Sequence, residues 1–249
     1  MQYEQEIRYS RHLSLSEVGK EGQEKLLDAK VLVVGAGGLG SPSLLYLAAS
    51  GVGTIGIIDD DKVELSNLQR QVLHETSDIG LPKTESAKEA LHDLNPNTQI
   101  NSHQLRLNEG NIESIITNYD IVLDGSDNLE TRLLINDYCY KLRKPLVSAA
   151  IQGFSGQLST FKAFLGEPNP CYRCIYPDIE SARITQNCSN SGVIGSIAGV
   201  MGTWQALEVT KEILGIGESL SGSLIIFDAL ASASRKIKVR RNKNCACCG

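Results

Sequence analysis

The sequence lacks an apolar segment long enough to cross a membrane, since polar residues interrupt every stretch of about 18 residues. Residues 1–14, MQYEQEIRYSRHLS, carry charges throughout and lack the apolar core of a signal peptide. Both absences argue against a membrane protein and a secreted protein. We therefore expect a cytoplasmic protein with no membrane partner.

The sequence also lacks an excess of basic charge. Its 29 acidic and 24 basic residues give a net charge of −5 and an isoelectric point near 5.5. Proteins that bind nucleic acids by neutralising phosphates normally carry a basic surface. The basic run at residues 235–243 alternates like an edge strand with a solvated face. We therefore expect no nucleic-acid partner.

Apolar strands and helical segments alternate between residues 31 and 150, a pattern typical of βαβ crossovers. It predicts an α/β fold with a doubly wound, mostly parallel, Rossmann-like sheet. The 249 residues contain no evident linker or repeat, so one domain is expected, with residues 1–30 as an N-terminal helical arm. Within the nucleotide-binding half, 31–150, the expected strands are 31–35, 54–59, 99–105, 119–124 and 145–149, and the expected helices are 40–50, 82–95, 111–118 and 128–142.

The pattern changes after residue 150. Apolar and polar residues alternate with a period of two in residues 156–164, which predicts an antiparallel strand. An irregular crossing is expected over 166–191 and a mostly buried helix over 194–214. The last expected strands, 223–228 and 234–240, complete an antiparallel extension before a zinc-knuckle tail.

The first strand runs into a Gly-x-Gly-x-x-Gly turn at Gly35, Gly37 and Gly40, and the second strand ends on Asp59. Such a turn exposes backbone N–H groups and a helix N-terminus to phosphate. An acidic residue at the end of the second strand accepts hydrogen bonds from ribose hydroxyls. This pattern by itself is typical of an NAD- or FAD-dependent oxidoreductase.

Further polar residues follow the strand ends. In a parallel sheet these positions line one crevice, and two or three cations with a nearby carboxylate suit a triphosphate with Mg²⁺ better than a pyrophosphate. The alternative is that the cations are solvated surface charges. We find no catalytic His, Tyr or Lys motif of an oxidoreductase, and the four histidines form no motif with a serine or cysteine. The residues concerned are Asn67, Arg70, Lys83 and Asp127.

Two Cys-x-x-Cys pairs, Cys171/Cys174 and Cys245/Cys248, predict one structural zinc with four thiolate ligands. Disulfides within the pairs are the alternative, which a reducing cytosol disfavours. Cys247 adds a third sulfur to the tail, as a free thiol or as an alternative ligand.

Several motifs together resemble the HesA/MoeB/ThiF family of adenylyltransferases, which are relatives of ubiquitin-activating enzymes. These motifs are RYSRH, GAGGLGSP, GVGTIGIIDDD, LSNLQRQ, LDGSDN, PCYRC and the terminal Cys-x-x-Cys, in the family's order and over almost the whole chain. The resemblance implies ATP- and Mg²⁺-dependent adenylation of a small ubiquitin-like sulfur carrier of the MoaD/ThiS class, at the C-terminal glycine of its Gly-Gly end. Pyrophosphate would be released, in molybdopterin or thiamine biosynthesis.

The resemblance also implies a role for each motif residue. Asp59 would hold the ribose, Asp127 would handle Mg²⁺, and Arg11 would reach into the site of a neighbouring subunit, so a homodimer is expected. The catalytic set is then Asp127, Arg70, Arg11 and Lys83. The nucleotide-binding set is Gly35, Gly37, Gly38, Gly40, Asp59, Asp61, Asn67, Gln69, Arg70, Lys83, Asp127 and Asn128.

Cys188 lies in the predicted crossing and matches a family cysteine that forms a persulfide linkage with the carrier in ThiF-like members. In MoeB-like members that cysteine is dispensable, and an ordinary loop cysteine is the alternative. A polar loop beside a helix N-terminus would lower the pKa of its thiol. Cys139 is expected in a helix core. Because the sequence ends at the cysteine tail, we expect a separate sulfur donor, a cysteine desulfurase or a sulfurtransferase.

Three other functions remain open at this point. One is the NAD-dependent oxidoreductase, and the second is a non-catalytic zinc scaffold that binds a nucleotide as a structural ligand. The third is an adenylating dehydratase of the same superfamily that acts on a modified tRNA base. The two zinc knuckles and the absence of a basic surface favour the carrier protein as substrate.

Overall fold

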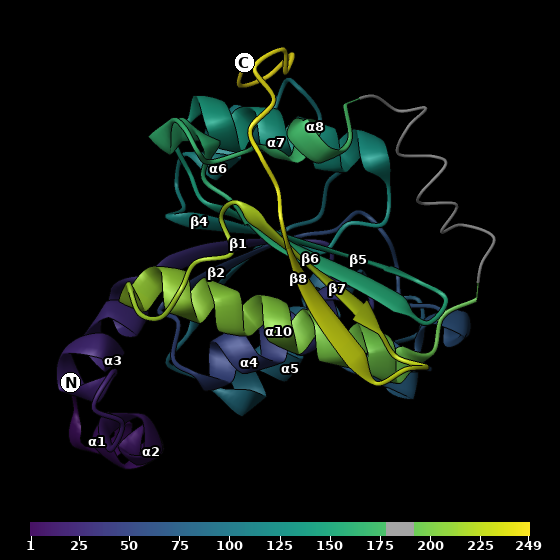
Figure 1. The fold of residues 1–249 in the computed structure, drawn as a ribbon. Coiled ribbons are helices and arrows are strands. Elements are labelled where there is room, and N and C mark those ends of the chain that lie inside the picture. Colours follow the sequence, from purple (N-terminus) through teal and green to yellow (C-terminus); the bar gives the residue numbers. More distant parts are fainter. Residues whose placement is uncertain (178–191) are drawn as a thin grey trace.

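A sheet of eight strands runs through the middle of the computed structural model, which describes residues 1–177 and 192–249 (Figure 1). The strand order is β3-β2-β1-β4-β5-β6-β7-β8, parallel from β3 to β5 and antiparallel from β5 to β8. The predicted fold class is confirmed. The strands are β1 (Lys30–Val34), β2 (Thr54–Ile58), β3 (Gln99–His103), β4 (Ile121–Asp124), β5 (Leu146–Gln152), β6 (Ser155–Phe161), β7 (Ser223–Asp228) and β8 (Ala233–Lys238).

Helices cover the sheet on both faces (Figure 1). Those on one face are α3 (Gly19–Asp28), α4 (Gly40–Ala49), α5 (Lys83–Leu94) and α10 (Gly195–Leu214). On the opposite face are α6 (Ile112–Ile116), α7 (Leu129–Lys141) and α8 (Tyr172–Ile175). The N-terminal arm contains the short helices α1 (Tyr3–Arg8) and α2 (Ser10–Leu13), and 3₁₀ turns lie at Leu65–Asn67, Thr76–Asp78 and Ala163–Leu165. No described helix is both long enough and apolar enough to span a membrane.

The central strands read as uninterrupted apolar runs because helices bury both of their faces. Along β1, Val31 and Val33 pack into the core on the α10 side, whereas Leu32 and Val34 pack into the core on the α7 side. Successive side chains of a strand point to opposite faces, so one strand contributes to both cores.

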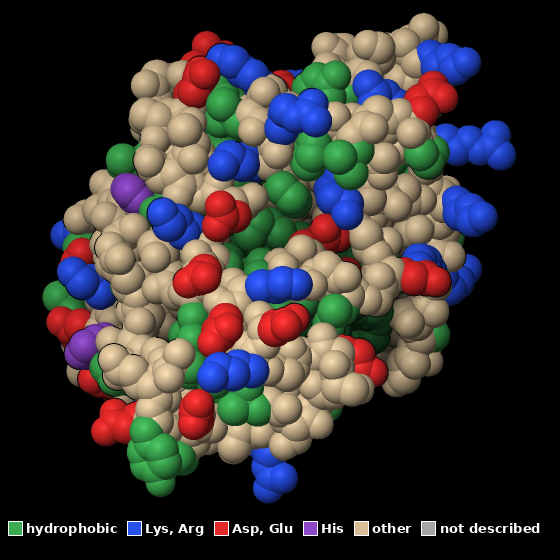
Figure 2. All heavy atoms as spheres, turned by 90° about the vertical axis from the view of Figure 1, so that its left-hand side faces the viewer, with side chains coloured by type: hydrophobic (Ala, Val, Ile, Leu, Met, Phe, Trp, Pro, Cys, Tyr) green, Lys and Arg blue, Asp and Glu red, His purple; other side chains and the backbone are tan. Residues whose placement is uncertain are grey.

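The antiparallel edge strand β8 exposes all six of its residues. Its lysine and arginine side chains protect the open edge from pairing with another chain. This confirms the prediction of a solvated basic edge strand. On the face drawn in Figure 2, acidic and basic side chains are interspersed and leave no broad basic area.

The predicted irregular crossing differs from the structure at its start, where α8 forms one turn of helix. Cys174 N–H donates to Cys171 O at 3.0 Å, and Tyr172 N–H donates to Asn136 Oδ1 of α7 at 2.7 Å. The turn therefore depends on a contact with a distant helix, which the local pattern does not encode.

Glycine allows α10 to approach the start of α4. A Cβ atom at Gly202 would lie 2.3 Å from Leu39 O and 2.6 Å from Pro42 Cγ. Substituting Gly202→Ala should therefore destabilise the fold by about 1–3 kcal/mol through overpacking. The control is Gly199→Ala, where a Cβ meets no described atom within 4 Å. Its better helix propensity should stabilise the protein by up to about 1 kcal/mol. Urea unfolding of both variants measures this, and equal midpoints would contradict the packing claim.

Candidate functional site

The glycine turn after β1 closes against the loop after β4. Gly35 has a φ of 93°, and a Cβ there would lie 2.9 Å from Gly125 O. A Cβ at Gly40 would lie 1.8 Å from Gly35 O. A larger residue fits neither position, so both glycines are required by the turn itself. Gly37 is less crowded, since a Cβ there would meet only the Gln71 side chain, at 3.7 Å.

Asp59 leaves the end of β2 and is held by the same turn. Ala36 N–H donates to Asp59 Oδ2 at 2.8 Å, and Asp61 N–H donates to Asp59 Oδ1 at 2.9 Å. Burial raises the pKa of the Asp59 carboxyl, and the Lys83 ammonium opposes that shift. The carboxylate group is thereby oriented beside the turn, at the end of the second strand.

Lys83 begins α5 and has a nearly buried side chain. Its Nζ donates to Asp61 Oδ2 at 2.7 Å, and its backbone N–H donates to Asp61 O at 3.0 Å. The Asp61 side chain is 68% exposed, so this carboxylate can exchange its partner for solvent or a ligand. Oxygens of Asp59, Asp60 and Asp61 lie within 4.8 Å of one another, a grouping that could hold a cation.

Arg70 lies against the glycine turn. Its Cγ and Cδ are 3.5 Å from the Cβ position of Gly38, and its Nη1 donates to Ser66 O at 3.1 Å. Asn67 Oδ1 accepts from Glu64 N–H at 3.2 Å and so caps the 3₁₀ turn Leu65–Asn67.

Gln69 contacts the start of α10 through its backbone. Its side chain is exposed, and its carbonyl packs so closely on Gly195 that a Cβ there would lie 2.3 Å away. Of the predicted residues in this segment, Arg70 is therefore the one that meets the glycine turn.

Asp127 is exposed in the loop between β4 and α7. Asn128 Oδ1 accepts from Thr131 N–H at 2.9 Å, which makes Asn128 the N-cap of α7. Arg132 is nearly buried, and its Nη2 donates to Ser126 O at 2.5 Å. Sequence reasoning missed Arg132. Arg132 follows Asn128 by one helical turn, so its side chain faces back toward the loop. This spacing is the feature of the sequence that could have identified it.

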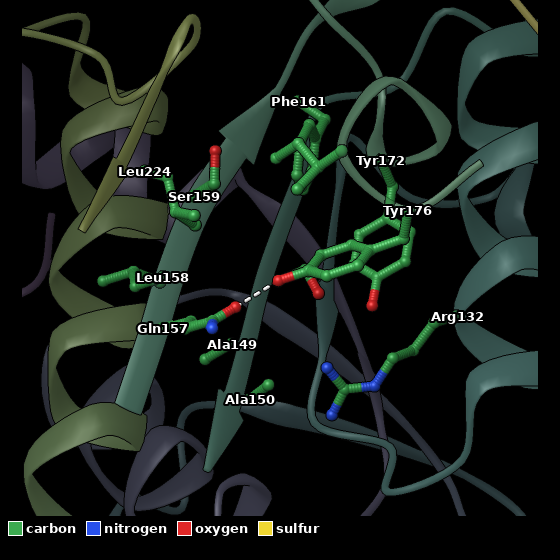
Figure 3. A pocket seen from close by; sticks show the side chains of 12 residues that line it. Arg132, Ala149, Ala150, Gln157, Leu158, Ser159, Phe161, Tyr172, Tyr176 and Leu224 are labelled. Carbon is green, nitrogen blue, oxygen red and sulfur yellow. Dashed lines mark hydrogen bonds between the residues drawn. The ribbon is translucent and has the colours of Figure 1, made fainter. Parts of the chain in front are cut away.

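A small hollow lies between α7, α8 and the strands β5 and β6 (Figure 3). Arg132 enters it from α7, and the Tyr176 hydroxyl donates to Gln157 Oε1 across it. Burial raises the pKa of Tyr176 to about 12, so its hydroxyl keeps its proton at neutral pH. Arg132 therefore gives the hollow a polar wall on the side of the loop that carries Asp127.

The four cysteines of the two pairs come together, with all sulfurs within 4.8 Å of one another. The Cys171–Cys245 and Cys174–Cys248 sulfur distances are both 3.5 Å. A tetrahedral zinc with four sulfurs at about 2.3 Å places them about 3.8 Å apart, whereas a disulfide needs about 2.05 Å. The donor set and spacing thus fit a four-coordinate zinc and do not fit disulfides.

Contacts from α7 hold this cluster in place. Asn136 Nδ2 lies 3.6 Å from Cys247 Sγ, so the additional sulfur of the tail points toward this helix. Arg173 makes a two-pronged ion pair with Asp137, at 2.7 and 2.6 Å. Cys139 is buried in the core of α7, which confirms its predicted place.

Two predicted residues stay apart from this arrangement. Arg11 is exposed on α2 in the N-terminal arm, and the described part of the chain shows no contact between it and its own glycine turn. Cys188 lies outside the described residues, so its role stays a prediction.

Comparison with known proteins fits this geometry. The sequence profile of the ThiF family matches residues 9–248. The chain belongs to the ThiF family. Sulfur carrier protein adenylyltransferase of Thermus thermophilus is 46% identical over 244 residues, 97% of this chain and 90% of that protein.

Two further proteins extend the comparison. Adenylyltransferase and sulfurtransferase MOCS3 of Culex quinquefasciatus is 49% identical over 242 residues. This chain spans only 55% of the length of that protein. The crystal structure of E. coli MccB with ATP has a TM-score of 0.81 at 26% identity, covering 97% of this chain and 73% of that one.

Proposed function

We propose that this ThiF-family protein transfers the adenylyl group of ATP to the C-terminal glycine of a small ubiquitin-like sulfur carrier and releases pyrophosphate. The observation that carries the proposal is the contact of Arg70 with the glycine turn, which also binds Asp59 through the Ala36 N–H. The name of the Thermus relative, which this chain matches over 90% of its length, supports the carrier as substrate.

The chemistry requires charge neutralisation, because a carboxylate must attack the α-phosphorus of a polyanion. Arg70 and Lys83 would lower that repulsion, and the turn would hold the phosphates in line for attack. No side chain needs to form a covalent bond in this step. Mg²⁺ held by Asp127 would neutralise further phosphate charge, and an exposed carboxylate at a strand end is a suitable ligand for it.

The binding of a second copy is part of the proposal. Arg11 is exposed on an arm whose Tyr3 and Ile7 side chains are 76% and 59% exposed. A guanidinium at this position would complete the phosphate site of a neighbouring subunit. The homodimer would then be needed for activity, and the carrier would receive its sulfur from a separate donor.

The main alternative is an oxidoreductase that binds a dinucleotide. The cationic side chains near the glycine turn distinguish it from an enzyme that binds ATP. A pyrophosphate needs little beyond the glycine turn, whereas a triphosphate benefits from Lys83 and Arg70.

We therefore expect millimolar ATP with Mg²⁺ to raise the midpoint of thermal unfolding by several degrees, because ligands that bind the native state stabilise it. NAD at the same concentration should leave the midpoint unchanged. Stabilisation by NAD alone would favour the oxidoreductase.

Asp127 provides the test of catalysis. Substituting Asp127→Asn should lower carrier-dependent exchange of pyrophosphate into ATP by about 10²–10³-fold, because one preorganised electrostatic contact is lost. Glu130→Gln, which changes an exposed carboxylate of α7 three residues further on, is the control and should retain the wild-type rate. The assay uses carriers of the molybdopterin and thiamine pathways in parallel. Full exchange by Asp127→Asn would remove Asp127 from the mechanism.

The cysteine cluster is proposed as a structural zinc site formed by Cys171, Cys174, Cys245 and Cys248. Elemental analysis should find one zinc per chain. Substituting Cys171→Ala should remove the metal and lower stability, because a structural zinc contributes its binding free energy to folding. Cys247→Ala is the matched control and should keep the metal. A metal-free native protein of full stability, or loss of zinc in both variants, would contradict this assignment.

A further inference from the structure

His74 is nearly buried and makes two short contacts that the sequence does not predict. Its Nδ1 lies 2.7 Å from Ser86 Oγ, and Ser86 Oγ donates to Asp78 Oδ2 at 2.7 Å. On its other side, His74 Nε2 lies 3.0 Å from Ala36 O in the glycine turn. The sequence shows no motif that joins a histidine to a serine, so this pairing arises from the fold. The contact forms only when α5 docks beside the turn.

This arrangement differs from that of a hydrolase triad. In a triad the histidine lies between the acid and a serine that remains open to substrate. Here Ser86 lies between Asp78 and His74, and its side chain is buried. The serine is therefore enclosed on both sides by its partners and cannot serve as a nucleophile.

The contact with Ala36 fixes the position of one hydrogen on the ring. Because a carbonyl oxygen only accepts, His74 Nε2 must carry the hydrogen that it donates to Ala36 O. Burial lowers the pKa of His74. Ser86 has one hydroxyl hydrogen, which lies within reach of both Asp78 Oδ2 and His74 Nδ1, and the contact with Ala36 needs only the hydrogen on Nε2. Asp78, Asp59 and Lys83 are the charged groups whose fields act on the ring.

Ala36 is held on both sides by this contact and by Asp59. Its N–H donates to Asp59, and its carbonyl accepts from His74 and, at 3.4 Å, from Ser41 Oγ. In a trans peptide the carbonyl and the next N–H point in opposite directions. A carbonyl directed at His74 therefore aims the N–H of Gly37 away from His74. Glycine tolerates many backbone conformations, so this peptide would rotate easily without an anchor.

We propose that His74 is a positioning residue, which fixes the peptide between Ala36 and Gly37 so that the Gly37 N–H faces the phosphates of the nucleotide. The inference rests on the proposed use of the turn for ATP. Ser86 lies one helical turn after Lys83 on α5, so the same contact also ties the phosphate turn to the helix that carries the buried lysine.

The test compares His74→Leu with His74→Gln in the full-length protein. Leucine removes both hydrogen bonds, whereas glutamine places an amide donor at a similar reach. We expect His74→Leu to raise the KM for ATP in carrier-dependent pyrophosphate exchange by about tenfold, with kcat and the carrier KM little changed. This pattern follows from loss of a contact made equally in the ground state and the transition state. His74→Gln should return the KM for ATP to within about twofold of wild type.

A purely structural role would give a different result. His74→Leu would then lower kcat through loss of folded enzyme, with an unchanged KM for ATP and no rescue by glutamine, and this outcome would overturn the proposal. Should His74→Leu not fold, Ser86→Ala decides instead, since it removes the support of Nδ1 and keeps the ring. A KM for ATP raised severalfold supports the proposal, and an unchanged KM overturns it.

Calorimetric titration with ATP alone separates this proposal from the proposed function. If the wild type binds ATP but shows no exchange with any carrier, adenylation of the carrier fails. The ATP affinity of the His74 variants then still decides the positioning role, by the same tenfold loss and glutamine rescue. If wild type binds no ATP, both proposals fail.

Discussion

The close approach of the glycine turn to the loop after β4 is the constraint on which the rest of the site depends. Gly40 meets Gly35, and Gly35 meets Gly125, at separations that leave no room for a side chain. This contact brings the carboxyl ends of β1 and β4 to one edge, beside the end of β2 with Asp59. Asp59 and the loop that carries Asp127 take their positions from that edge.

Helix α7 connects the proposed nucleotide site with the proposed zinc site at the cysteine cluster. Its first residues follow Asp127 and are capped by Asn128, while Asn136 near its other end holds the backbone of Tyr172 beside the cysteine cluster. Arg132 lies between them and anchors the Ser126 carbonyl. The same helix therefore positions the loop of Asp127 and receives the tail that the cluster fixes. A zinc at the cluster would support the nucleotide edge only indirectly.

The elements that sequence predicted well are those whose pattern is local. Because both faces of β1 are buried, its sequence is a continuous apolar run. The Cys-x-x-Cys spacing predicts a metal site whatever sequence lies between the two pairs. The contacts that sequence missed join distant segments. His74 meets Ser86 only because α5 packs beside the glycine turn, and α8 forms because Asn136 accepts from its first N–H. The proposed contact of Arg11 with a second subunit would require an assembly that no single chain contains.

The most direct test of the central claim is a crystal structure of the protein with Mg²⁺ and a non-hydrolysable ATP analogue. The account predicts phosphates over Gly37 and Gly38 beside Arg70, with the ribose hydroxyls on Asp59. The Ala36 carbonyl should still point to His74 in that complex. A nucleotide bound away from the glycine turn, or phosphates with no contact to Arg70 or Lys83, would contradict it.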